Sequence, residues 1–334
     1  MTPMESILQH FYEWYFPINI IISFVFNIYL IYLINTTKSA LLKNMQLYLL
    51  NTTVFELLVS ISAFFAQCRI VPNQNTLAVF CYGSCKHFGP YACYLTFAIV
   101  QGAVVAATFS ILLAFYYRYR LLVVEIYKRI NHFRNLTIFS ILPIAMIIFQ
   151  LTTDSDFDKV VAETRQLHPN YDFENNSVFG YSNMKGIGSI IAQSMISVGV
   201  YIAPLVALYF RYQINKMLGI STKHRAPIQY CKQLVTGLMI QALIPFFLYV
   251  PAYSYFLYSR VTGFESLYWE YITNILGTLT AIINPILTII YVLPYRRAFV
   301  RMILRHNMVW SVEETTHTET HNQRHNFHLQ HQRF

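Results

Sequence analysis

The stretch CYGSCKHFGP at residues 81–90 leads into a run without Lys, Arg, Asp or Glu that continues from 87 to 117 and ends in YYRYR at 116–120. At about 1.5 Å of rise per residue, this run is long enough to cross a bilayer of about 30 Å as a helix. Cysteines at one end and arginines at the other indicate an oxidising space and the cytosol, respectively. Small residues between 102 and 107 allow close helix approach, so we expect the central helix of a membrane bundle.

The composition also favours a membrane protein. Of the 334 residues, 55% are hydrophobic and 12% are charged, whereas soluble domains carry about 25% charged residues. The net charge of +9 could suggest a nucleic-acid partner. The basic residues instead gather in alternate loops, which is the distribution of the positive-inside rule, so no nucleic acid is expected.

Apolar segments long enough for a span recur seven times. They occupy about 14–34, 46–66, 87–117, 136–152, 187–210, 234–258 and 269–293. Five prolines lie inside these segments and predict helix kinks: Pro143, Pro204, Pro245, Pro251 and Pro285. The expected fold is an all-α membrane protein, a bundle of seven transmembrane helices.

Charge sets the expected orientation. With the amino terminus outside, 18 of the 24 Lys and Arg residues fall on the cytoplasmic side, so the carboxyl terminus lies inside. Residues 1–12 would be a short extracellular terminus with no cleaved signal peptide, and 13–310 the membrane domain. Tyr295, Phe299 and Ile303 share one face of an amphipathic surface helix at about 295–305. The His-rich tail at 311–334 is expected to be disordered and cytoplasmic; a metal site there is the weaker alternative.

Three polar residues within spans form a predicted intramembrane cluster: Asn27, Glu56 and Asn284. A charged carboxylate costs about 2.5–3.5 kcal/mol or more at a helix centre, so Glu56 should face the protein interior. The alternatives are a neutral carboxyl with a structural role and an Asn27 amide that bonds a neighbouring backbone.

Four cysteines lie near the expected outer loop, at Cys68, Cys81, Cys85 and Cys93. At least one disulfide is predicted among them, and three full connectivities stay open. A zinc site is a weak alternative, because Cys-x3-Cys lacks a second tight pair, and no metal or cofactor is expected. Asn175 begins the sequon Asn175-Asn176-Ser177 in the acidic loop 153–186 and is the glycosylation candidate.

The chain resembles the nematode serpentine chemoreceptors, seven-helix G-protein-coupled receptors, over about 14–305. The 81–90 loop resembles class delta of that superfamily; QALIP at 241–245, Asn284-Pro285 and PYRR at 294–297 resemble the superfamily generally. The resemblance implies a plasma-membrane receptor, in sensory neuron cilia, that binds a small odorant or pheromone and signals to a heterotrimeric G protein. A weaker likeness to rhodopsin-like receptors has departures: Tyr117 replaces the usual acid before Arg118, and loop 153–186 has no cysteine.

A receptor of this kind would act by a population shift between two packings of the bundle. Candidate ligand contacts in the outer half are Gln101, Gln193, Gln241, Tyr249, Tyr253 and Asn274. Candidate switch and G-protein-coupling residues are Arg118, Tyr119, Asn284, Pro285 and Tyr291. For each pocket candidate a helix–helix contact is the alternative; for Arg118 it is a membrane anchor like Arg120. Without a neighbouring acid, Arg118 is expected to bond carbonyls or tyrosine hydroxyls.

A channel, a transporter and a membrane enzyme are the alternatives to a receptor. A ligand-gated channel of the insect odorant type would place its amino terminus inside, against the charge distribution. A small-solute transporter usually shows repeated halves or several intramembrane charges, and Glu56 is the one found. A membrane enzyme needs a reactive constellation; no His-box pair, Gly-x-Ser-x-Gly or acid pair occurs, so an enzyme is not expected.

Overall fold

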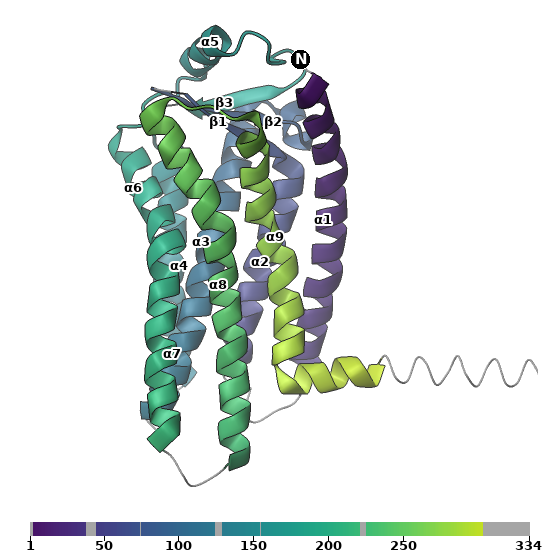
Figure 1. Cartoon of the computed structure of the whole chain (residues 1–334), viewed down its shortest axis with the longest axis vertical. Helices are drawn as coiled ribbons and strands as arrows, with labels where there is room; N and C mark the ends of the chain where they lie inside the picture. Colours follow the sequence, from purple (N-terminus) through teal and green to yellow (C-terminus); the bar gives the residue numbers. More distant parts are fainter. Residues whose placement is uncertain are drawn as a thin grey trace, which may run out of the picture.

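The computed structural model describes residues 3–37, 45–73, 75–123, 129–153, 155–220 and 225–302. Seven helical rods within these ranges are long and apolar enough to span a membrane (Figure 1). They are α1 (Pro3–Thr36), α2 (Gln46–Ala66), α3 (Pro90–Val123), α4 (Arg129–Leu151), the continuous rod of α6 (Ile187–Ser197), η2 (Val198–Ile202) and α7 (Ala203–Ile220), α8 (Arg225–Thr262) and α9 (Leu267–Tyr291). The chain is therefore a multi-pass membrane protein, as its seven apolar segments predict.

The outer surface of the bundle is apolar. Large side chains such as Ile21, Ile141 and Leu205 are 58–63% exposed, which water would make unfavourable but lipid does not. Helix α3 lies at the centre and packs against α2, α4, α6, α7 and α8. Its Ala98, Ala103 and Phe115 are almost fully buried. The central position expected from the charge-free run agrees with these contacts.

The helices are longer than the apolar segments in the sequence. Helix α1 begins at Pro3 rather than near residue 14, and its 34 residues span about 50 Å. Helix α8 likewise covers 38 residues. Hydropathy marks only the part of a helix in lipid, whereas the backbone hydrogen bonds of a helix continue wherever the sequence permits. The first residues of α1 are therefore helical and pack on the structure described next.

A three-stranded antiparallel sheet covers one end of the bundle, which we call the sheet end (Figure 1). Strands β1 (Cys68–Pro72), β2 (Leu77–Cys81) and β3 (Ser177–Tyr181) pair in the order β1-β2-β3. The expectation of an all-α protein is wrong at this end, and the fold is mostly helical. The sequence pattern predicts loops here because each strand has only five residues, and β3 pairs with β2 about a hundred residues away in sequence.

Both faces of the sheet are buried. Leu77, Val79 and Phe179 pack toward the bundle, in one apolar cluster with Cys85 and Phe97. On the opposite face Ala78 and Phe80 pack with Val160 of α5 (Phe157–Leu167), which lies over the sheet (Figure 1). Asp156 caps the amino-terminal end of α5, and its side chain accepts a hydrogen bond from the Lys159 amide. The alternation along β2 thus places the sheet between α5 and the membrane helices.

Close backbone contacts require glycine at two points of the sheet end. A Cβ at Gly180 would lie 1.8 Å from the Leu77 carbonyl oxygen, and one at Gly83 would lie 2.3 Å from that of Phe65. No side chain fits at these distances. The pairing of β3 with β2 and the turn into η1 (Ser84–Phe88) therefore depend on these two residues.

Four of the five prolines named in the sequence lie inside helices, and the fifth follows a π-helical turn. Pro143, Pro245, Pro251 and Pro285 lie inside α4, α8, α8 and α9. The fifth rod contains the π-helical turn Val198–Ile202, directly before Pro204. A π turn is a common adjustment of a helix to a missing backbone donor, and such turns frequently occur at functional sites.

A short helix over residues 293–302 follows α9 at the end opposite the sheet. It runs nearly perpendicular to the bundle (Figure 1). Tyr295 is buried, whereas Arg297, Arg301 and Met302 are exposed. This arrangement is that of a helix lying along a membrane surface. The His-rich tail at 311–334, for which disorder was expected, lies outside the described residues.

Candidate functional site

A cavity of about 190 Å³ lies in the half of the bundle nearest the sheet. All seven helical rods contribute to its walls, and its roof includes Ile70, Leu77 and Tyr181 from the three strands. Most of the lining is apolar, with a few amides and hydroxyls. A small apolar cavity with few polar groups is the usual form of a small-molecule site.

Five of the six predicted ligand contacts line this cavity: Gln101, Gln193, Tyr249, Tyr253 and Asn274. Each also joins helices or carbonyl groups by hydrogen bonds. The Tyr249 hydroxyl contacts the Gly277 carbonyl at 3.0 Å, and the Tyr253 hydroxyl donates to the Gln193 carbonyl at 3.1 Å. The two interpretations of these residues, cavity lining and helix contact, therefore apply together.

The sixth predicted contact, Gln241, does not reach the cavity. Its amide donates to the Asn284 carbonyl at 3.0 Å and to the Thr288 hydroxyl at 2.6 Å. Gln241 precedes Tyr249 by eight residues, which places it about 12 Å farther from the sheet along α8. Its assignment to the ligand pocket is corrected here: depth along the helix separates it from the other five.

Gln241 belongs instead to the intramembrane polar cluster. The predicted members Asn27, Glu56 and Asn284 line one small cavity of about 10 Å³ together with Gln241. Asn284 donates to Glu56 Oε1, and Asn27 donates to the carbonyls of Ser23 at 2.8 Å and Ala281 at 2.9 Å. These bonds connect α1, α2, α8 and α9 at mid-membrane, where an unpaired polar group is costly.

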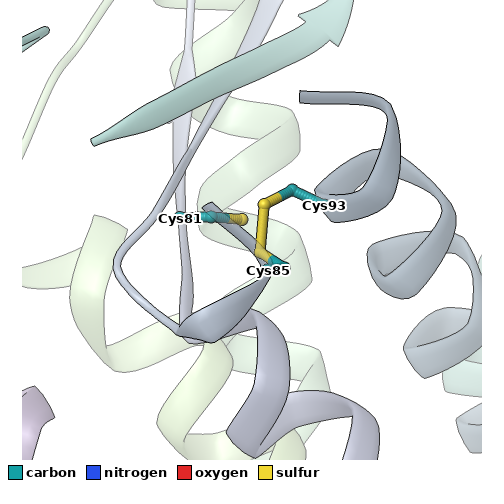
Figure 2. Close-up of side chains that lie close together, drawn as sticks. All are labelled: Cys81, Cys85 and Cys93. Atoms are coloured by element: carbon teal, nitrogen blue, oxygen red, sulfur yellow. A yellow bond between two sulfur atoms is a disulfide. The ribbon is translucent and has the colours of Figure 1, made fainter. Parts of the chain in front are cut away.

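The four predicted cysteines form two disulfides, Cys68–Cys81 and Cys85–Cys93. Cys68 and Cys81 lie opposite each other on β1 and β2, so the first bond closes the hairpin. The second joins η1 to the first turn of α3, and Cys81 points toward it (Figure 2). The sulfurs of Cys81, Cys85 and Cys93 lie within 4.8 Å of one another. Disulfide sulfurs are not thiolates, the form in which cysteine binds zinc.

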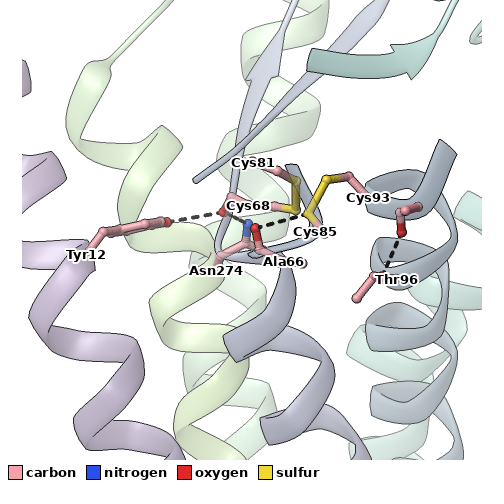
Figure 3. Close-up of a disulfide and its surroundings, with 9 residues drawn as sticks. Tyr12, Ala66, Cys68, Cys81, Cys85, Cys93, Thr96 and Asn274 are labelled. Atoms are coloured by element: carbon pink, nitrogen blue, oxygen red, sulfur yellow. Dashed lines mark hydrogen bonds between the residues drawn. A yellow bond between two sulfur atoms is a disulfide. The ribbon is translucent and has the colours of Figure 1, made fainter. Parts of the chain in front are cut away.

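The Cys68 carbonyl connects the sheet to two helices (Figure 3). It accepts hydrogen bonds from the Tyr12 hydroxyl of α1, at 3.5 Å, and from the Asn274 amide of α9. The Tyr12 hydroxyl also donates to the Tyr271 carbonyl at 2.5 Å. Because Asn274 lines the cavity, a shift of α9 at this position would be transmitted to the roof.

A buried ion-pair cluster at the sheet end was missed by the sequence analysis. Arg69 of β1 is fully buried and contacts Glu5 Oε1 at 2.9 Å and Glu270 Oε2 at 2.7 Å. Its guanidinium also lies 4.2 Å from the centre of the Tyr171 ring and 4.6 Å from that of Tyr271. The cluster therefore joins α1, β1, α9 and the loop before β3. The available signal was a lone arginine in the otherwise apolar strand CRIVP.

His168 lies beside this cluster. Its ring stacks on Tyr171 with the ring centres 4.6 Å apart, and its Nε2 lies 3.6 Å from Glu265 Oε1. Burial lowers the pKa of His168, and the nearby Arg69 charge lowers it further, whereas Glu265 and Glu5 oppose the shift. The imidazole is therefore mainly neutral at pH 7.

The five switch candidates do not meet in one place. Arg118 is buried and its Nε and Nη2 donate to the Met45 sulfur at 3.0 and 2.7 Å, where a carbonyl or tyrosine hydroxyl was expected. The Tyr119 ring lies 5.7 Å from that of Phe210 on α7. Asn284 and Pro285 belong to the mid-membrane cluster. Tyr291 packs on α8 where Gly237 leaves room.

Asn175, the glycosylation candidate, is exposed between α5 and β3. Its side-chain amide donates to Asp172 Oδ2 at 2.8 Å, and its backbone amide lies 3.1 Å from Asp172 Oδ1. The sequon ends at Ser177, the first residue of β3. Asn175 is thus accessible at the sheet end, and its modification stays a prediction.

The fold is that of a seven-helix membrane protein with a cavity of a size that suits a small molecule. The family model described as "Serpentine type 7TM GPCR chemoreceptor Srd" matches residues 12–301. Serpentine receptor class delta-51 of Caenorhabditis elegans is 52% identical over 306 residues, which cover 92% of this chain and 91% of the relative. Class delta-50 of the same organism is 34% identical over 331 residues, covering 96% and 97%, and class delta-59 is 26% identical over 303 residues, covering 88% and 91%.

The chain belongs to the serpentine receptor class delta family of nematode seven-transmembrane chemoreceptors. The resemblance found in the sequence is confirmed. Proteins of this family are receptors rather than enzymes.

Proposed function

We propose that this protein is a chemosensory receptor of the plasma membrane, in sensory neuron cilia, that binds a small odorant or pheromone in the cavity beneath the sheet and signals to a heterotrimeric G protein. The sheet end would face outward and the Arg118 end the cytosol. The observation that carries the proposal is the apolar cavity lined by all seven helical rods of a chain that belongs to a chemoreceptor family. It lies at the end that carries two disulfides, which are bonds of oxidising compartments.

The signal would pass by a population shift. A ligand in the cavity contacts α8 and α9 and therefore favours one of two packings of these helices. Both helices contain prolines and meet at the mid-membrane cluster through Gln241 and Asn284. Small changes near the sheet would then alter the packing at the opposite end, where Arg118 of α3 contacts Met45.

Arg118 is the residue proposed to change partners. A thioether is a weak acceptor for a guanidinium with five donors, so a carbonyl or carboxylate of a G protein would replace it at a net gain. The competing interpretation treats Arg118 as a membrane anchor comparable to Arg120, two residues farther along α3.

The test compares Arg118→Ala with Arg120→Ala in cells that carry a G-protein readout. Both variants should reach the cell surface, and only Arg118→Ala should lose signalling, by about tenfold or more in the response to an activating compound. Surface labelling of an amino-terminal tag measures delivery in the same cells. Equal signalling by Arg118→Ala and the parent protein would leave the anchor interpretation.

A further inference from the structure

Glu270 is the single charged side chain among the described residues that line the cavity. Its carboxylate is 2% exposed, and both Nε and Nη2 of Arg69 contact its Oε2 at 2.8 and 2.7 Å. The second carboxylate on Arg69, that of Glu5, does not line the cavity. A charged ligand would therefore be desolvated without a free counter-charge, which is strongly unfavourable.

Among the buried polar atoms of the cavity lining, the hydroxyl of Tyr181 interacts with Tyr94 and that of Tyr255 with Ser266. Two others are without hydrogen-bond partners among the described residues. They are Gln150 Oε1 at the end of α4 and the Ser189 hydroxyl oxygen at the start of α6, and the two residues are 2% and 3% exposed. The Gln150 amide nitrogen is already used, because it donates to Gln101 Oε1. Such buried groups are normally paired, so their pairing with a ligand is the simplest resolution.

The two atoms belong to helices that touch. Gly188 comes just before Ser189 and Phe149 just before Gln150, and a Cβ at Gly188 would lie 2.7 Å from the Phe149 carbonyl oxygen. Glycine at this position lets α6 approach α4 directly. One turn farther from the sheet, Met146 of α4 and Ala192 of α6 belong to one apolar cluster, so Gln150 and Ser189 lie on the sides of the two helices that face each other.

Their chemistry selects a functional group. The Gln150 oxygen accepts a hydrogen bond only, and the Ser189 hydroxyl donates or accepts. An alcohol can donate to the first and accept from the second. A ketone could accept from Ser189 but would leave Gln150 unpaired, and a hydrocarbon would leave both unpaired.

The cavity also limits the ligand's size. A dry protein cavity of about 150 Å³ holds benzene, and this cavity measures about 190 Å³. A ligand of about six to ten non-hydrogen atoms fits that volume.

We propose that the cavity binds a neutral, mainly apolar alcohol of this size, whose hydroxyl donates to Gln150 Oε1 and accepts from Ser189 Oγ. This inference rests on the proposed role of the cavity as the ligand site. It adds the chemical class of the ligand and the two residues that select it.

The first experiment uses the full chain purified in lipid nanodiscs and measures thermal unfolding with matched compounds. Linear, branched and cyclic skeletons of about six to ten heavy atoms are each tested as hydrocarbon, alcohol, ketone, carboxylate and primary amine. Alcohols should give the largest increase in melting temperature, with apparent affinities about tenfold above those of the ketones. A carboxylate or amine that binds best, a ketone equal to its alcohol, or no stabilisation by any alcohol would overturn the proposal.

The second experiment uses a matched pair of serine variants on α6. Ser189→Ala should weaken alcohol binding about fivefold to tenfold and leave hydrocarbon binding unchanged. Ser194→Ala is the control, because Ser194 is exposed and donates to the Ile190 carbonyl at 2.7 Å. Gln150→Leu should act in the same direction. Since the Gln150 side-chain amide also donates to Gln101 Oε1, the serine pair decides the matter if that variant does not fold. Equal alcohol binding by the two serine variants would contradict the proposal.

Binding in nanodiscs is measured without a G protein, so the two proposals can fail separately. Alcohol binding without a cellular response would leave the ligand class standing and count against the signalling function. A cellular response to carboxylates, lost on Ser189→Ala or not, would support signalling and overturn the ligand class.

Discussion

Among single residues, Arg69 has the largest predicted effect on stability. Its side chain is fully buried between Glu5 and Glu270, which are each 2% exposed. Arg69→Ala would leave two carboxylates buried without their counter-ion, so the free energy of unfolding should fall by about 3–5 kcal/mol. Thermal unfolding in nanodiscs measures the loss.

Arg165→Ala is the matched control, because Arg165 is exposed on α5 at the same end of the molecule. It should change stability by less than about 0.5 kcal/mol. Adding Glu270→Gln to Arg69→Ala should restore part of the lost stability, since it removes one unpaired charge. Equal losses for Arg69→Ala and Arg165→Ala would show that the cluster is not the anchor of the sheet.

At the scale of elements, the two disulfides depend on each other because their sulfurs are close. The sulfur atoms of Cys81, Cys85 and Cys93 (Figure 2) lie within 4.8 Å of one another. Cys68→Ser releases the Cys81 thiol next to the Cys85–Cys93 bond, and a thiolate can attack a neighbouring disulfide. We expect peptide mapping by mass spectrometry under non-reducing conditions to show Cys81 bonded to Cys85 or Cys93 in part of the molecules.

The double variant Cys68→Ser with Cys81→Ser is the control for exchange. It should keep Cys85–Cys93 intact and lose about 3 kcal/mol of stability, the value for a loop of this length. The hairpin would keep its backbone pairing and lose its cross-strand bond, so the roof of the cavity should loosen. Detection of Cys81 as a free thiol in every molecule of the single variant would contradict the exchange.

At the scale of the whole molecule, the distribution of charge predicts the orientation in the membrane. Eighteen of the 24 Lys and Arg residues belong to segments that the sequence predicts to be cytoplasmic. A tag at residue 1 should therefore be accessible to antibody on intact cells, and a tag at Phe334 only after permeabilisation. If antibody reached the amino-terminal tag only after permeabilisation, the predicted orientation would be wrong. That result would favour the channel interpretation over the receptor interpretation.

The sequence alone determined the spans, because a segment's preference for lipid depends on its own residues. It also placed Gln101, Gln193, Tyr249, Tyr253 and Asn274 near the cavity, since position along a span sets depth in the bundle. Tertiary structure alone decided which distant partners meet: Arg69 with Glu5 and Glu270, and Cys68 with Cys81. It also decided that β3 pairs with β2 and that Gly188 lets α6 approach α4 closely. These pairings are non-local: each depends on the packing of several elements at once, which no local pattern of hydropathy or charge encodes.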